Sequence, residues 1–237
     1  MKKRGFTLAE TLITLAIIGV VAALTIPILV ASYQKTQYVT QLKKVYSQFS
    51  EAVDRFLLDE GVEKVTNTDW LYSDASEDLI EIESDLGKFF NKYFKVIKDC
   101  GHESPSHCFA ENYTNINGDN ISPISINRIG GYSVITADGT SVSISFNQLG
   151  YPPELAIDVN GLKKPNVGGR DLFAFSVYYD GSLEDGITPN DCSVYCGYTG
   201  GTKEEARENK FRDYCREGGY GAGCFGKILN DNWKMDY

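Results

Sequence analysis

Four potential zinc ligands fall within nine residues near the middle of the chain. Cys100 and His102 are separated by one residue, and His107 and Cys108 are adjacent. Thiolates and imidazoles are good zinc ligands, but this spacing matches no common zinc module. The six cysteines form an even count, which fits an exported, oxidising setting better than the cytosol. We therefore expect a Cys100–Cys108 disulfide here rather than a metal centre.

An acidic loop offers oxygen ligands for a different metal. The run Asp158-Val159-Asn160-Gly161 resembles the start of a calcium loop, and Asp171 is a possible further ligand. A full EF-hand loop ends in a glutamate at its twelfth position, which here is Gly169. Calcium binding therefore stays open, and we predict no metal or cofactor for this chain.

The remaining catalytic patterns are incomplete. The glycine-rich run 217–223 lacks the Lys-Ser/Thr pair and the preceding strand of a phosphate-binding loop. No serine nucleophile elbow is present, and the only two histidines lie close together between cysteines. We predict that the protein is not an enzyme.

The most informative ionisable residue is Glu10, which lies in the apolar stretch from Phe6 to Pro27. A carboxylate at that depth in a bilayer costs at least ~2.5 kcal/mol, so it needs a partner or a function. The basic leader Met1-Lys2-Lys3-Arg4-Gly5 precedes the stretch and places its start on the cytoplasmic side. A secretory signal peptide would end in an A-x-A-like cleavage site, and none follows this stretch.

The run Lys3-Arg4-Gly5-Phe6-Thr7-Leu8-Ala9-Glu10 closely resembles the N-terminus of type IV prepilins and type II secretion pseudopilins. The resemblance implies that a membrane aspartic peptidase, the prepilin peptidase, cuts after Gly5 and that the new N-terminal Phe6 is N-methylated. It also implies that Glu10 of one subunit neutralises the amine of a neighbour. Each charge alone is costly in lipid, so this pairing would favour assembly. The specific motif covers about the first 30 residues, and the later resemblance is architectural.

A long helix must carry this segment. Beyond the apolar part, helical spacing continues to about Asp59, which gives a helix of about 80 Å. We predict a cleaved leader over 1–5, a transmembrane and filament-core helix over 6–31, its amphipathic half over 32–60, and an exported globular domain over 61–237. The apolar stripe of the amphipathic half consists of Val39, Leu42, Val45, Tyr46, Phe49, Val53 and Phe56.

The exported domain shows a second helical pattern and then strands. Ser76 is a possible N-cap for a helix with an aromatic stripe. Strands are predicted at 132–137 and 140–146, around a two-residue Asp138-Gly139 turn, and at 155–159 and 172–179. Their short linkers indicate an antiparallel sheet, and the order indicates an α+β fold. This agrees with the pilin fold that the resemblance implies. The helical stripe consists of Leu79, Ile82, Leu86, Phe89, Phe90, Tyr93, Phe94 and Ile97.

The last third, from Asp180, is rich in glycine and poor in periodicity. We expect disulfide-rich loops there. The nearest-neighbour pairing is Cys100/Cys108, Cys192/Cys196 and Cys215/Cys224, although six cysteines allow fifteen connectivities. Cys215–Cys224 is the preferred bridge, and Cys192 and Cys196 have other possible partners.

The charge balance limits the partners. Loss of the three leader cations leaves 20 basic side chains against 32 acidic ones, a balance of −12. Such acidity argues against a broad nucleic-acid surface. We predict a structural subunit of a type IV pilus-like filament or a type II secretion pseudopilus. Its partners would be the prepilin peptidase, other subunits and the cytoplasmic (inner) membrane, which it crosses once with the globular domain exported.

Two alternatives stay open. One is a minor or tip pilin whose globular domain binds a surface, DNA or a secretion substrate. The other is a membrane-anchored binding protein or enzyme that never polymerises.

Overall fold

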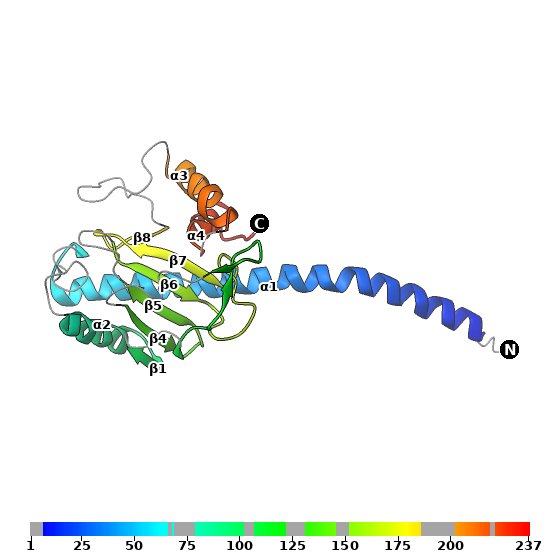
Figure 1. The fold of residues 1–237 in the computed structure, drawn as a ribbon, viewed down its shortest axis with the longest axis horizontal. Helices are drawn as coiled ribbons and strands as arrows, with labels where there is room; N and C mark the ends of the chain where they lie inside the picture. The colour runs from blue at the N-terminus through cyan, green and yellow to red at the C-terminus, as the bar shows by residue number, and fades with distance from the viewer. Residues whose placement is uncertain are drawn as a thin grey trace, which may run out of the picture. The chain divides into compact units, whose positions relative to one another are not determined.

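Helix α1, Leu8–Glu60, is the longest element of the chain (Figure 1). In this computed structural model it runs without interruption through the apolar segment and the amphipathic stripe. The chain forms two compact units, residues 1–37 and residues 38–237, and we call the second unit the head. The structure describes residues 7–65, 68, 79–101, 107–121, 131–145, 152–185, 202–218 and 221–237, without the side chains of 79–85.

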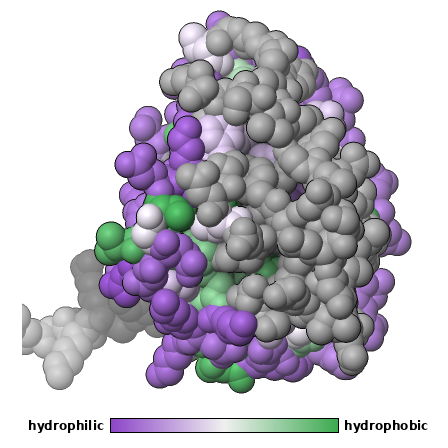
Figure 2. Space-filling model, turned by 90° about the vertical axis from the view of Figure 1, so that its left-hand side faces the viewer, coloured by the Kyte–Doolittle hydropathy of each residue, from purple (hydrophilic) through white to green (hydrophobic). Residues whose placement is uncertain are grey.

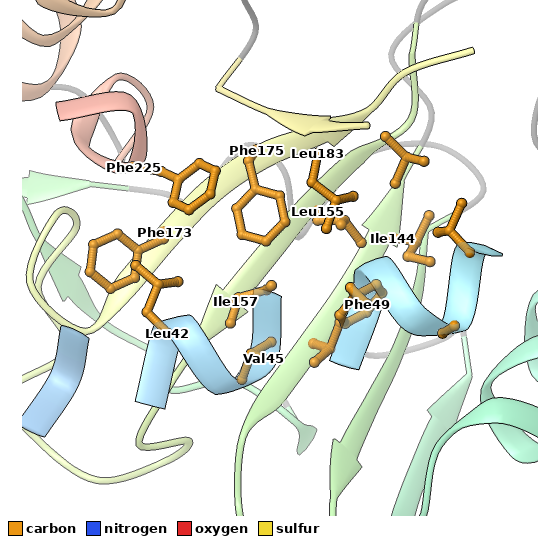
Figure 3. Close-up of a cluster of buried hydrophobic side chains, with 14 of the residues drawn as sticks. Leu42, Val45, Phe49, Ile144, Leu155, Ile157, Phe173, Phe175, Leu183 and Phe225 are labelled. Carbon is orange, nitrogen blue, oxygen red and sulfur yellow. The ribbon is translucent and has the colours of Figure 1, made fainter. Parts of the chain in front are cut away.

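The C-terminal half of α1 forms one wall of the main core of the head. Six of the seven predicted stripe positions are buried, and Tyr46 is partly buried against the same cluster. Figure 3 shows Leu42, Val45 and Phe49 of α1 facing Ile157, Phe173 and other apolar side chains of the sheet. The three- and four-residue spacing therefore builds the interface between α1 and the sheet.

The opposite wall is a six-stranded antiparallel sheet (Figure 1), so the predicted α+β, pilin-like fold is confirmed. The strand order is β1-β4-β5-β6-β7-β8. The four predicted strands correspond to β4, β5, β6 and β7. The bounds are β1 Val96–Gly101, β4 Tyr132–Thr136, β5 Ser141–Ser145, β6 Glu154–Asp158, β7 Leu172–Val177 and β8 Leu183–Glu184.

The second predicted helix is shorter than its stripe. Helix α2 spans Leu79–Tyr93, and Ile97 lies in strand β1 with 63% of its surface exposed. The assignment of Ile97 to a helical stripe was therefore wrong. Strand β1 pairs with β4, so a long-range ladder overrides the local spacing. The possible N-cap Ser76 lies outside the described residues.

The turn between β4 and β5 is one residue longer than predicted. The Thr136 N–H donates to the Thr140 carbonyl at 3.0 Å, which encloses three residues rather than two. The Gly139 N–H donates to the Thr136 carbonyl at 2.8 Å, and Gly139 has φ +84°. A turn followed by a left-handed glycine is a common three-residue hairpin.

A smaller core covers the other face of the sheet. Phe109 and Tyr113 pack with Ala156 and Leu172, which point away from α1 on their strands. The short hairpin of β2 Tyr113–Thr114 and β3 Asn120–Ile121 belongs to this layer. Serine hydroxyls of the sheet form hydrogen bonds with each other, and the Ser133 hydroxyl lies 3.0 Å from that of Ser143. The central strands β4–β7 are therefore buried on both faces, whereas edge strand β1 is largely exposed.

The C-terminal region contains helices where we expected only loops. Helix α3 spans Lys203–Lys210, the π-helix η4 spans Phe211–Arg216, and α4 spans Cys224–Asn230. A capping box begins α3, in which the Glu205 N–H donates to the Thr202 hydroxyl and the Thr202 N–H donates to the Glu205 carboxylate. The pattern Thr-x-x-Glu is visible in the sequence and would have predicted this start.

Two of the three nearest-neighbour cysteine pairs are disulfides in the structure, Cys100–Cys108 and Cys215–Cys224. Cys192 and Cys196 lie outside the described residues. The Cys215–Cys224 bridge ties η4 to α4 across a sequence separation of 9.

Replacing both Cys215 and Cys224 with alanine should lower the free energy of unfolding by about 2–3 kcal/mol. The bridge closes a short loop, and the entropy that it removes from the unfolded chain corresponds to about this value. Urea unfolding of the oxidised protein and the double variant measures the difference. Equal midpoints would contradict the expectation.

Candidate membrane and assembly segment

The apolar part of α1 exposes its hydrophobic side chains around the whole helix. By length and composition α1 can cross a membrane, with a mean hydropathy of 2.7 over its most apolar 18 residues. Such a surface is unfavourable in water and favourable in lipid or against sister helices. The large side chains that are about half or more exposed include Leu8, Leu12, Ile13, Leu15, Ile17, Ile18, Val20, Val21, Leu24, Ile26, Ile28, Leu29 and Val30.

The threonine hydroxyls of this segment bond to their own helix. Thr11 donates to the Leu8 carbonyl at 2.8 Å, Thr14 to the Glu10 carbonyl at 2.9 Å and Thr25 to the Val21 carbonyl at 2.9 Å. A hydroxyl that is satisfied within the helix needs no water, so these residues are compatible with a hydrocarbon environment.

Glu10 forms a capping box with Thr7 at the start of α1. Oε2 of Glu10 accepts the Thr7 N–H at 2.8 Å and the Thr7 hydroxyl at 2.9 Å, while the Glu10 N–H lies 3.3 Å from that hydroxyl. The carboxylate therefore lies at the N-terminal end of the helix, where the helix dipole favours negative charge. Gly5 and Phe6, the expected processing site, lie outside the described residues, and their role stays a prediction.

The cysteine and histidine candidates do not form a metal site among the described residues. Both thiols of the predicted cluster are consumed by the Cys100–Cys108 bridge, and His102 lies outside the described residues. The His107 backbone carbonyl accepts a hydrogen bond from Lys98 Nζ. Within the described part of the chain, no group of three or more His, Cys, Asp or Glu side chains is placed to hold a metal.

The possible calcium ligands Asp158, the last residue of β6, and Asp171, which directly precedes β7, are fully buried. Asp158 accepts the Tyr113 hydroxyl at 2.6 Å and the Asn160 N–H at 3.1 Å. Asp171 accepts the N–H groups of Asn166 and Val167 at 2.8 Å and 2.6 Å. Both carboxylates therefore receive donors from the protein itself, and they fix the loop between the strands.

Burial, with the nearby charge of Asp171, raises the pKa of Asp158 from 3.8 to about 8. Burial likewise raises the pKa of Asp171, against the donors from Val167 and Asn166. Because desolvation disfavours the charged form, the fold favours a proton on this pair.

Raising the pH from about 5 to about 8 should lower the free energy of unfolding, and Asp158→Asn should remove most of this dependence. The pKa of Asp158 is higher in the folded than in the unfolded chain, so the folded state binds more protons in this window. The contribution of Asp158 to the free energy of unfolding is complete below about pH 4. It is lost as the pH rises through the folded pKa, by at most about 1.4 kcal/mol per pH unit. Denaturant unfolding at several pH values measures this slope, and identical slopes in both proteins would contradict it.

A cavity of about 470 Å³ whose lining includes several charged side chains lies between α1, the end of α2 and the β4–β5 turn. Lys44 Nζ and Asp138 pair at 2.8 Å, and Arg55 and Glu51 pair at 2.6 Å. Lys44, Glu51 and Arg55 lie outside the apolar stripe of the amphipathic half. Their i, i+7 and i+11 spacing shows that they share a helix face, but the hairpin that closes the cavity is distant in sequence.

Comparison with known proteins gives two matches that together cover almost the whole chain. The prokaryotic N-terminal methylation motif, the signature of type IV pilins and pseudopilins, matches residues 1–26. A family of unknown function (DUF6613) matches residues 28–237. Neither a curated protein nor a solved structure matches the chain.

Proposed function

Because the chain belongs to the family of unknown function DUF6613 and begins with the methylation motif of type IV pilins and pseudopilins, we propose that it is a filament subunit of a type IV pilus-like or type II secretion machine. The motif implies processing by a prepilin peptidase and association with pilin-type subunits in the membrane. It points to a structural subunit rather than an enzyme.

The observation that carries this proposal is the exposed apolar helix that begins with a capped carboxylate. The motif and this helix fit a membrane-anchored subunit that faces away from the cytoplasm. We propose that the helix crosses the cytoplasmic membrane once before assembly and then packs with sister helices in the filament core. Repeated packing of one surface on a different surface of the next copy produces an open helical assembly.

Co-expression with a prepilin peptidase tests the processing step. The mature chain should lose residues 1–5 and begin with an N-methylated Phe6, which intact-mass analysis detects. A Gly5→Leu precursor provides the matched control and should remain uncut. An unprocessed native chain would favour the alternative of a membrane-anchored binding protein that does not polymerise.

The large head supports a second role within the same machine. About 200 residues belong to the head, and its surface contains the charged cavity beside α1. A minor or tip subunit needs a surface that binds something outside the filament, whereas a major subunit is repeated throughout it. Quantitative mass spectrometry of sheared filaments separates the two roles, because a tip subunit is rare relative to the main one.

A further inference from the structure

The loop between β6 and β7 has an exposed surface that is positively charged, in contrast to the acidic chain. We call residues 159–170 the basic loop. Lys163, Lys164 and Arg170 are exposed. Leu162, which directly precedes the two lysines, is 51% exposed. The basic loop contains no acidic residue, so its formal charge is +3.

The two acids that flank the basic loop do not cancel this charge at the surface. Asp158 and Asp171 are fully buried, and burial raises the pKa of both carboxyl groups. Their oxygens face N–H and hydroxyl donors within the protein. The solvent-facing side of the basic loop is therefore cationic, with an apolar tip.

The conformation of the basic loop is fixed by its own hydrogen bonds. The Asn160 side-chain amide donates to the Lys164 carbonyl at 3.2 Å, which holds the turn that carries Leu162 and the two lysines. The Val167 and Asn166 N–H groups hold its second half on Asp171. Because these hydrogen bonds already fix its backbone, the basic loop loses little backbone conformational entropy when it binds a partner.

The basic loop adjoins Tyr38, the first residue of the head. Burial and the charge of Asp171 raise the pKa of Tyr38, while the Arg170 guanidinium and the Asn160 amide act in the opposite direction. Figure 1 shows the β6–β7 connection at the end of the sheet where the head portion of α1 begins.

Few residues connect the expected membrane span to the head. Six residues lie between Ala31, the last residue of the expected membrane span, and Tyr38. These residues are helical and rise about 10 Å in total. This is comparable with the headgroup layer and with the Debye length of about 8 Å at physiological ionic strength.

We propose that the basic loop docks on anionic phospholipid headgroups on the exported side of the membrane and orients the head before assembly. This inference rests on the proposed membrane anchoring. Lys163, Lys164 and Arg170 bind headgroup phosphates, and Leu162 enters the interface between them. The rest of the acidic head is repelled by the same surface, so docking selects one orientation.

Lipid is a better match for this surface than a neighbouring head. An exposed leucine beside lysines suits the headgroup boundary, where apolar and charged side chains are both accommodated. The short chain between the expected span and Tyr38 also limits how far the basic loop can lie from the headgroups in an isolated subunit. The other end of the head, shown in Figure 2, is mainly hydrophilic among its described residues, with scattered hydrophobic side chains.

Lysine footprinting of the full chain in nanodiscs tests this proposal. One subunit is placed in each disc, made of phosphatidylcholine alone or with phosphatidylglycerol, and an amine-reactive acetylating reagent is added. Lys163 and Lys164 should be acetylated more slowly in the anionic discs, and high salt should remove this protection. Arg170→Gln should reduce the protection about fivefold, since each basic residue near an anionic surface contributes about that factor.

Lys64→Gln is the matched control, because Lys64 is exposed, follows the far end of α1 and carries the same charge. It should leave the protection unchanged. Equal acetylation in both kinds of disc, or an equal effect of the two variants, would overturn the proposal. Protection that requires several subunits per disc and ignores lipid charge would also overturn it and assign the surface to a neighbouring head. Peptidase cleavage, measured on separate samples, reports the proposed function independently.

Discussion

A Glu10→Gln subunit should insert into the membrane normally but enter filaments at least about 100-fold less than the native subunit. We expect Glu10 to neutralise the amine that cleavage creates on Phe6 of a neighbour. Removing one member of a buried ion pair costs about 3–5 kcal/mol, because the remaining charge is left unpaired. Native and variant subunits are co-expressed and quantified in membranes and in sheared filaments. The membrane amounts measure insertion, and the filament amounts measure incorporation.

Glutamine separates this charge effect from the capping effect. In the structure Oε2 of Glu10 caps the Thr7 N–H, and a glutamine oxygen can accept the same hydrogen bond. A second variant, Glu10→Leu, removes both the cap and the charge. If pairing matters, the two variants assemble equally poorly. Near-native assembly of Glu10→Gln alone would assign Glu10 to helix capping and contradict the intersubunit pair.

Much of the fold was predictable because its signals are local. The stripe of α1 repeats every three or four residues, and four strands of the sheet alternate or run apolar between turn residues. The N-terminal motif is a continuous run, so the comparison with known families confirms it directly. These features depend on residues that are close together in the sequence, so a single sequence is enough to predict them.

The features that escaped prediction depend on residues far apart in sequence. Ile97 continues the spacing of α2, but β1 gains its ladder from β4 more than thirty residues later. Tyr113 and Asp158, which meet across the second face of the sheet, are 45 residues apart. No local sequence pattern predicts such contacts. The capping box of α3 is the exception, because Thr202 and Glu205 form a local signal in the sequence.

Two buried acids form hydrogen bonds with the C-terminal helical region. Glu184 at the end of β8 accepts two hydrogen bonds from the Arg207 guanidinium and pairs with Lys203 at 2.6 Å. Asp185 accepts the Gly223 and Gly226 N–H groups, both at 2.8 Å, at the start of α4. Lys210 Nζ lies 3.5 Å from the Asp185 carboxylate and 2.6 Å from its backbone carbonyl.

Asp185→Ala should therefore lower the free energy of unfolding by about 3–5 kcal/mol. The residue is 1% exposed, so loss of its carboxylate leaves two buried N–H donors without their acceptor and leaves the Lys210 ammonium with only the backbone carbonyl of residue 185. Asp185→Asn keeps one oxygen and should lose about half as much, whereas the exposed Asp236→Ala should change little. Urea unfolding compares the stabilities, and hydrogen exchange over residues 203–230 locates the change. A loss below about 1 kcal/mol in Asp185→Ala, or one matched by Asp236→Ala, would show that these helices are held mainly by the apolar contacts of Phe225 and Ile228.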